Sequence, residues 1–336
     1  MASGSNKRVR LNYLAIIKAL VFLVAVILAV VLMVVIIKQS SAADESDASS
    51  VSHAASQPAQ TSDEESQETS QTQTHSNYTF LSVDNSLIYE GSLILVNNEY
   101  GYSFPSDQNV NASMADTKTD NYYVSDRDVA LRPYVTEKFN AFMAAYIASG
   151  ASKDIIVVNG YLDYSSQATR YQKIIDKYGE EQGSLMAAKP GGVDAHTGLS
   201  VELKLYISGS IKAYDSTGTR TWIEENAYLY GFILRFPEGK AMTTGLNASS
   251  NKYRYVGLPH SAFIKQNGLT LEEYIVTVQN YRYDTVHWTC ELSGVKYEVY
   301  YVPADDGSTT DIPVPTDSDY TISGNNVEGF IVTVTK

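Results

Sequence analysis

The chain has 336 residues, a formal net charge of −13 at pH 7 and one cysteine. This length allows one good-sized domain with additional segments. The acidic balance argues against a nucleic-acid partner, because such a partner requires Lys and Arg side chains that neutralise phosphates. The single cysteine, Cys290, excludes an internal disulfide and fits a small apolar position in a strand.

Two segments at the N-terminus predict a membrane anchor. Residues 1–18 are basic and contain no acidic residue, and residues 19–37 are nineteen consecutive apolar residues. At ~1.5 Å per residue, this run is close in length to the ~30 Å hydrocarbon core of a bilayer. Because the positive charges precede the run, we expect a single-pass helix in the cell membrane, with a cytoplasmic N-terminus and the bulk of the chain extracytoplasmic. Cleavage of this segment near Ala43, as in a signal peptide, is the alternative.

Residues 38–76 differ in composition from the remainder of the chain. They are rich in Ser, Thr, Gln and acidic residues and contain almost no large apolar residue. Such a segment cannot bury enough apolar surface to offset the entropy lost on ordering. It predicts a disordered linker that holds the C-terminal domain away from the membrane.

The folded region begins near residue 77, and we bound its main domain at 77–280. Apolar runs and alternation predict strands at 92–97, 155–159, 230–236 and 253–256, with a loop at 239–252 between the last two. Helical spacing predicts helices over 134–148, after Tyr164, and over 183–188. Thr270 and Glu273 form a capping box that opens a helix ending near residue 280. Short strands with separate helices indicate an α+β fold.

Residues 281–336 predict a small all-β appendage. Alternating patterns at 288–292, 297–302 and 330–334 are joined by turns rich in Gly, Asp, Asn and Pro. We expect three or four strands and no catalytic residue in this region.

Three motifs of the main domain resemble those of a known family. They are KPGGVDAHTGLSVEL at 189–203, YGFILRFP at 230–237 and RYVG at 254–257. They are similar to the motifs of VanY-type D-alanyl-D-alanine carboxypeptidases, the zinc DD-peptidases that trim peptidoglycan stem peptides. The resemblance covers about residues 92–280. It implies the DD-peptidase (hedgehog/DD-peptidase-like) fold, a location at the bacterial cell wall, and a peptidoglycan peptide or another cell-wall component as partner.

The residues that carry the family's chemistry differ in this chain. In the family a His and an Asp of the first motif and a His of the third bind zinc, and a Glu of the third motif is the general base. Carried over by position, the metal ligands correspond to Ala195, Glu202 and Lys252, and the base corresponds to Ser249. Of these, only Glu202 can bind a metal, and a serine hydroxyl cannot act as a general base near neutral pH. The resemblance therefore implies the loss of zinc and of hydrolysis.

Substrate recognition has changed as well. The family's S-G-Y-R-S-Y-x-x-Q segment corresponds to NGYLDYSSQ at 159–167, in which Leu162 replaces the Arg that clamps the peptide's terminal carboxylate. An aliphatic side chain cannot replace that bidentate contact. Tyr161 and Gln167 remain, and with Glu202, Lys252 and Arg254 they complete the candidate residues of the cleft.

Two further hypotheses concern the empty metal position. His196 and His260 could form a relocated zinc site with Glu202, although a shift by one residue in a strand turns a side chain to the opposite face. Lys252 and Glu202 could instead form an ion pair that fills the site, which requires a separation below about 4 Å.

These observations allow three functions. The first is a non-catalytic member of the family that binds a stem peptide, a glycan or a protein partner through the old cleft. The second is an active zinc carboxypeptidase with relocated ligands. The third is an adaptor in which the β appendage binds and the peptidase-like domain is a spacer. A serine hydrolase is not supported, because no nucleophile motif surrounds Ser249 or Ser250.

Overall fold

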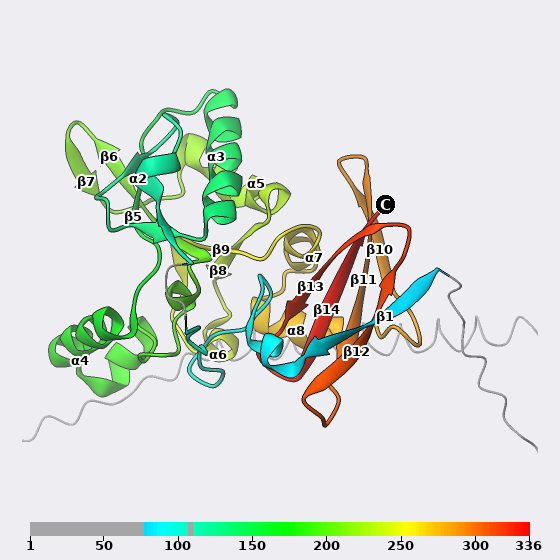
Figure 1. Ribbon diagram of the computed structural model, residues 1–336. Helices are drawn as coiled ribbons and strands as arrows, with labels where there is room; N and C mark the ends of the chain where they lie inside the picture. Colours follow the sequence, from blue (N-terminus) through cyan, green and yellow to red (C-terminus); the bar gives the residue numbers. More distant parts are fainter. Residues whose placement is uncertain (1–76, 107–109) are drawn as a thin grey trace, which may run out of the picture. The chain divides into compact units, whose positions relative to one another are not determined.

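A computed structural model describes residues 77–106 and 110–336, which lie within a single compact unit (Figure 1). The predicted tail, membrane anchor and linker, residues 1–76, lie outside the described residues. Within the described ranges, no helix has both the length and the apolar character that a membrane crossing requires.

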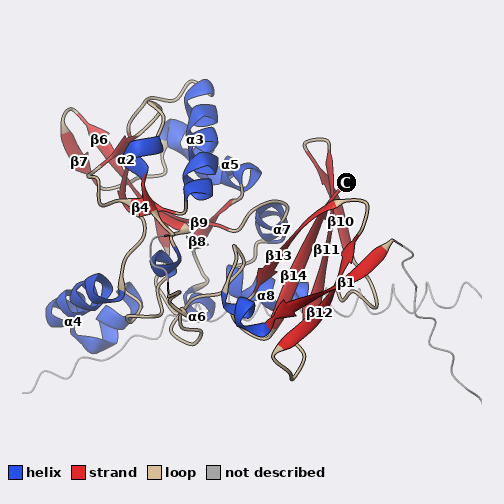
Figure 2. Cartoon of the chain, in the orientation of Figure 1, coloured by secondary structure: helices blue, strands red, loops and turns tan. Residues whose placement is uncertain are grey.

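Helices and strands follow one another in mixed order along the chain. Figure 2 shows where the helices and strands lie. The α-helices are α2 (Met114–Thr117), α3 (Pro133–Ala148), α4 (Tyr164–Met186), α5 (Thr221–Asn226), α6 (Ala241–Thr244), α7 (His260–Asn267) and α8 (Leu271–Val278). The 3₁₀ helices are η1 (Asn85–Tyr89), η2 (Asp194–Thr197), η3 (Gly218–Arg220) and η4 (Ala227–Tyr230). The strands of the first part are β1 (Tyr78–Asp84), β2 (Ala112–Ser113), β3 (Tyr123–Val124), β4 (Ala130–Leu131), β5 (Ile155–Asn159), β6 (Ser200–Ile207), β7 (Ser210–Lys212), β8 (Phe232–Phe236) and β9 (Ser249–Tyr255). The strands of the C-terminal part are β10 (Trp288–Leu292), β11 (Val295–Pro303), β12 (Thr309–Pro315), β13 (Asp319–Gly324) and β14 (Gly329–Thr335).

A six-stranded sheet forms the centre of the peptidase-like region. Its strand order is β3-β5-β6-β9-β8, with β7 paired to β6, and only the β3–β5 pair is parallel. Helix α3, which the helical spacing predicted, packs against this sheet, and Phe139 and Phe142 are fully buried there beside Phe232. The helices and the largely antiparallel sheet confirm a mixed helix–sheet fold.

The alternation of strand β6 decides which side chains face the core. Val201, Leu203 and Leu205 are buried in the main core, so Glu202 between them points to the opposite face of the sheet. The same alternation on β9 buries Tyr253 in that core and turns Lys252 to the face of Glu202. The sheet therefore places the two carried-over metal positions on one face.

A second sheet forms the C-terminal part, with the strand order β10-β11-β14-β13, beside a two-stranded sheet of β1 and β12. This part has five strands, one or two more than expected, and the additional ones are β12 and β13. Strand β1 pairs along its whole length with β12, so the first strand of the described chain is joined to the region predicted as an appendage. A shared core also links the two regions, because Leu93 and Leu95 pack in one cluster with Tyr301 and Ile331.

Several predicted elements differ in the structure. The helix predicted at 183–188 is the end of α4, which stops at Met186, and the strand predicted at 230–236 begins at Phe232, after η4. Residues 92–97 form no strand, and their apolar side chains are buried on irregular backbone that supplies carbonyl acceptors to buried arginines. The expected loop 239–252 is shorter, since it contains α6 and ends where β9 begins at Ser249. Ser249 and Lys252 thus lie on a strand instead of a loop. The predicted capping box at Thr270 and Glu273 is confirmed, with both reciprocal hydrogen bonds formed.

Candidate functional site

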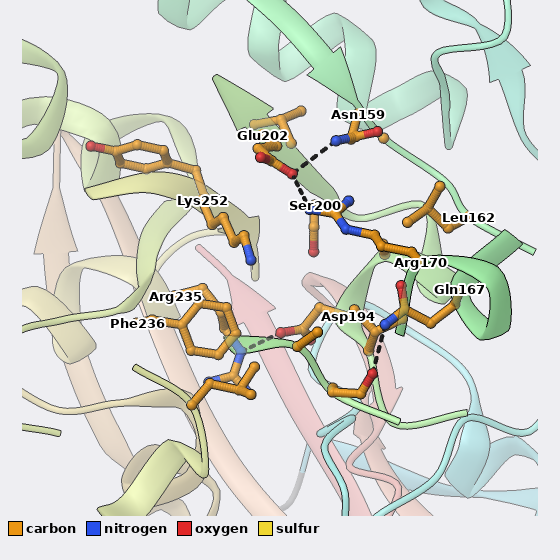
Figure 3. Close-up of a pocket in the computed structure, with 18 of the residues that line it drawn as sticks. Asn159, Leu162, Gln167, Arg170, Asp194, Ser200, Glu202, Arg235, Phe236 and Lys252 are labelled. Atoms are coloured by element: carbon orange, nitrogen blue, oxygen red, sulfur yellow. Dashed lines mark hydrogen bonds and ion pairs between the residues drawn. The ribbon is translucent and has the colours of Figure 1, made fainter. Parts of the chain in front are cut away.

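A cavity of about 60 Å³ lies on the face of the central sheet that carries Glu202 and Lys252 (Figure 3). Its walls come from the end of β5, the first turns of α4, η2, the start of β6, the end of β8 and the middle of β9. These elements bring together Leu162, Gln167, Ala195, Glu202 and Lys252, which are far apart in the sequence. Three of the five candidate cleft residues, Gln167, Glu202 and Lys252, therefore line one cavity.

Glu202 and Lys252 are direct cross-strand neighbours, because the register of β6 and β9 pairs them. They form no ion pair, however. The Glu202 carboxylate instead accepts hydrogen bonds from the Asn159 amide at 2.8 Å and from the Arg170 guanidinium at 3.1 Å. The predicted Glu202–Lys252 pair is thus wrong, since another cation has taken the carboxylate.

Arg170 is the site residue that sequence reasoning missed. It lies on α4 three residues after Gln167, so both side chains project from the same side of the helix toward the cavity. This three-residue spacing is the feature of the sequence from which Arg170 could have been predicted. Burial opposes ionisation of Glu202, but Arg170, Lys252 and the Asn159 amide together outweigh it, and the pKa of Glu202 lies below its usual range.

The Lys252 ammonium projects into the cavity between Glu202 and the Asp194–Arg235 pair, as Figure 3 shows. It lies 5.6 Å from the centre of the Phe236 ring. Among residues 77–106 and 110–336, no carboxylate oxygen lies within 4.0 Å of it. Burial is the main cause that lowers the pKa of Lys252, the nearby Glu202 charge opposes this shift, and the Arg170 charge adds to it.

A network of four buried charges lies beneath the cavity, and two of its members, Asp194 and Arg235, reach the cavity lining. Asp194 pairs with both Arg235 and Arg254, and Arg235 also forms a two-pronged contact with Glu272 at 2.7 and 2.9 Å. Arg254 completes its bonding to the carbonyl oxygens of Ser92, Ile94 and Tyr255. Arg254 is fully buried in this network, so the structure places this cleft candidate below the cavity and not in its wall.

Two further carried-over positions, Ser249 and Tyr161, also lie outside the cavity wall. The Ser249 hydroxyl donates to the Asn251 side chain at 2.6 Å on β9. Tyr161 lines a separate small cavity with Tyr102 and Phe104, and burial raises the pKa of its phenol. Neither residue is among those that line the cavity around Lys252.

The two histidines of the alternative metal site are committed to other partners. The Gly191 N–H donates to Nε2 of His196 at 3.0 Å, so Nδ1 carries the proton and donates to the Leu162 carbonyl at 2.6 Å. His196 lies on the 3₁₀ helix η2 instead of a strand, and burial lowers its pKa. The ring nitrogens of His260 lie 2.5 Å from the Tyr274 hydroxyl and 2.9 Å from the Thr333 hydroxyl. His196, Glu202 and His260 therefore do not converge.

The residues present do not fit the zinc ion that the resemblance implies. Zinc needs three side chains with free electron pairs and an open position. The carried-over positions present a methyl group from Ala195, an ammonium from Lys252 and one carboxylate from Glu202, which already has two donors. In the part of the chain that the structure describes, no three His, Cys, Asp or Glu side chains are grouped so that they could hold a metal ion.

Two polar atoms of the cavity wall have unused hydrogen-bonding capacity. Gln167 is only 2% exposed, and its amide nitrogen donates to the Ala188 carbonyl at 2.6 Å. Its Oε1 atom and the Ser200 hydroxyl are buried without a hydrogen-bond partner among the described residues. Buried polar atoms are normally satisfied, so these two require a ligand or ordered water.

Comparisons with known proteins agree with the motifs. The family model described as VanY, D-alanyl-D-alanine carboxypeptidase, matches residues 128–258. A D-alanyl-D-alanine carboxypeptidase of Enterococcus faecium is 35% identical over 250 residues, which are 74% of this chain and 76% of that protein. The bifunctional D-Ala-D-Ala dipeptidase and D-Ala-D-Ala carboxypeptidase VanXYC of Enterococcus gallinarum is 32% identical over 155 residues, 45% of this chain and 80% of that protein.

A solved structure extends the likeness to the fold. The vancomycin-resistance D,D-dipeptidase VanXYg, in complex with a D-Ala-D-Ala phosphinate analogue, aligns with a TM-score of 0.68 and 28% identity. The alignment covers 77% of this chain and 99% of that one. The range 92–280, in which the motifs lie, is 189 of 336 residues or 56% of the chain, so the similarity continues beyond it. On the strength of the Enterococcus faecium relative and the shared fold, this chain belongs to the VanY-type D-alanyl-D-alanine carboxypeptidase family.

Proposed function

We propose that this chain is a non-hydrolytic member of its family that binds a peptidoglycan stem peptide through the cavity around Lys252. The observation that carries the proposal is the Lys252 ammonium at a position that the resemblance assigns to a metal ligand. A positive charge there disfavours a metal cation, and hydrolysis by this route needs the metal as Lewis acid. The remainder of the cavity is retained as a binding site.

The protein acts at the outer side of the cell membrane in this proposal. The apolar run 19–37 anchors it with a cytoplasmic N-terminus, and residues 38–76 give the domain reach into the wall. A peptide is favoured over a glycan or a protein partner, because the relatives are named for D-Ala-D-Ala peptide substrates.

The first experiment measures metal and activity on the same sample. The full-length chain, purified in mild detergent, is incubated with zinc and freed of unbound metal, and its zinc content is determined. Release of D-alanine from diacetyl-L-Lys-D-Ala-D-Ala is then assayed. We expect far less than one zinc per chain and no D-alanine release above a no-protein control.

A gain-of-ligand variant provides the positive control. The triple substitution Ala195→His, Glu202→Asp and Lys252→His places the family's ligand types at the carried-over positions. Because Glu202 and Lys252 are cross-strand partners on one sheet face, we expect this variant to retain close to one zinc per chain. This result would show that the scaffold still supports the metal and that the side chains alone exclude it.

The alternative function is an active carboxypeptidase, which the names of the relatives favour. Stoichiometric zinc in the unaltered chain, together with metal-dependent D-alanine release, would establish the alternative and end the proposal.

A further inference from the structure

The charges in and beneath the cavity do not balance. Four side chains are cationic, namely Arg170, Arg235, Arg254 and Lys252, and three are anionic, namely Asp194, Glu202 and Glu272. Among the described residues, every one of these seven is in an ion pair except Lys252. One unit of positive charge is therefore left over, and it lies on the ammonium that projects into the cavity.

Lys252 also faces a second cation. Arg170 lines the same cavity and is close enough to disfavour the charged form of Lys252. Two cations that face one cavity repel each other, and an anion between them would remove the repulsion. The Arg170 guanidinium has five N–H donors, and its contact with Glu202 uses one of them. It can therefore donate to a ligand without releasing Glu202.

The remaining wall adds a polar acceptor and an apolar end. Gln167 Oε1 is buried, lacks a partner among the described residues and belongs to the cavity lining, so it can accept from a ligand N–H. Leu162, Val193 and Ala195 supply apolar surface in the same lining. The volume of about 60 Å³ admits a small group and excludes a bulky side chain.

We propose that the cavity binds the terminal carboxylate of a peptide, with the carboxylate on Lys252 and Arg170, where the family's catalytic members would hold a cation. The N–H of the terminal residue donates to Gln167, and its small side chain lies on the apolar surface near Leu162 and Ala195. This inference rests on the proposed function and names the ligand class of the same site.

The position of the anion has a consequence for the kind of peptide bound. In the family, an arginine at the position of Leu162 would hold a carboxylate that lies one peptide residue beyond Lys252. Leu162 replaces this arginine, so the described cavity wall has no cation at that position. A peptide that ends at Lys252 is one residue shorter than a carboxypeptidase substrate placed in the same cleft. A hydrolysis that removes one C-terminal residue must therefore supply the ligand.

The test compares four probes on the full-length chain. These are diacetyl-L-Lys-D-Ala, its C-terminal amide, diacetyl-L-Lys-D-Ala-D-Ala, and inorganic phosphate, each titrated by calorimetry at pH 7. We expect the acid to bind roughly tenfold or more tightly than the amide, because a charge-assisted contact is lost in the amide. The longer peptide should bind more weakly than the shorter one, and phosphate should bind more weakly than either peptide acid. This comparison uses the unaltered chain, so it does not depend on how a variant folds.

Variants locate the anion within the cavity. Lys252→Met should weaken binding of the acid roughly tenfold or more and leave binding of the amide unchanged. Lys204→Met is the matched control, because Lys204 lies on β6 of the same sheet and outside the cavity lining, and its affinity for the acid should equal that of the unaltered chain. NMR of the Lys252 side chain gives an independent readout, since a bound carboxylate should raise the pKa of its ammonium.

These outcomes separate the carboxylate site from the loss of hydrolysis, and a failure of every peptide to bind would also end the peptide-binding part of the proposed function. Equal binding of acid and amide, an unaffected Lys252→Met variant, or no binding of any probe at millimolar concentration overturns the carboxylate site. If phosphate binds as tightly as the peptide acid, peptide recognition is refuted and the cavity is only a general anion site. The proposal of lost hydrolysis is decided by zinc content and D-alanine release alone, so it can survive each of these results.

Discussion

The wall of the cavity and the charge network beneath it use the same kinds of side chain in opposite ways. In the network, Asp194, Arg235, Arg254 and Glu272 are nearly inaccessible to solvent, and each is in an ion pair. In the wall, Lys252 lacks a carboxylate partner among the described residues, although it lies beside one. A buried charge with a partner stabilises one structure, whereas a buried charge without a partner is costly.

The largest expected effect comes from breaking the network. Asp194→Asn would leave two buried guanidinium groups without the carboxylate that they share, and we expect a loss of about 3 to 5 kcal/mol in the free energy of unfolding. Urea unfolding of the full-length chain in detergent measures this loss. Asp116→Asn is the matched control, because the Asp116–Arg127 pair is largely exposed and should contribute less than about 1 kcal/mol. Equal losses in the two variants would refute the structural role of the network.

A smaller effect concerns acid stability and the buried His260. Burial lowers its pKa to about 3, and its ring nitrogens face the hydroxyls of Tyr274 and Thr333. His260 therefore binds a proton far less readily in the folded state than in the unfolded state, in which its pKa is near 6.5. The stability that His260 contributes is complete above pH 6.5 and is lost as the pH falls toward 3, by at most about 1.4 kcal/mol per pH unit.

His260→Gln removes this titration and isolates it from the other acid-sensitive groups. The variant should be less stable than the unaltered chain at pH 7, because the two hydroxyl contacts are disturbed. The difference should shrink by about 2 to 3 kcal/mol between pH 6.5 and pH 4.5, as measured by urea unfolding at each pH. A difference that stays constant over this range would mean that His260 can be protonated in the folded state, which would also reopen its candidacy as a metal ligand.

The sequence predicts those features of the site that depend on local pattern and motif position. The family motifs and strand alternation were enough to bring Glu202, Lys252 and Gln167 to one cavity, and helical spacing and the capping box located α3 and α8. These features depend on local pattern, which the sequence states directly. The positions of the family motifs were also enough to identify Leu162, Ala195 and Lys252 as the residues that replace the family's functional side chains.

The features that could not be predicted depend on side chains that meet across distant elements. Arg170, which lies on helix α4, forms the ion pair with Glu202 that Lys252 was expected to form. The sequence does not show which of two nearby cations pairs with one carboxylate. Arg254, a candidate cleft residue that belongs to the RYVG motif, lies instead below the cavity, where Asp194 and the carbonyl groups of the irregular segment 92–97 hold it. The pairing of β1 with β12 joins residues more than 200 positions apart, beyond any periodicity.

The smallest expected effect is a gain in stability at the cavity itself. Lys252→Met keeps an apolar contact with Phe236 and removes an ammonium that burial disfavours, and Glu202 keeps Arg170 as its partner. We expect the free energy of unfolding to rise by about 1 kcal/mol at pH 7.

This gain should depend on pH. Because the pKa of Lys252 is lower in the folded than in the unfolded state, the full cost of its charge is present below the folded-state pKa. It disappears as the pH rises toward 10.5, so the two proteins should converge in stability there. Lys204→Met should change stability by less than about 0.5 kcal/mol at either pH. If Lys252→Met instead destabilised the chain at pH 7, Lys252 would be part of the structural network, and the contrast between a satisfied network and an unsatisfied wall would fail.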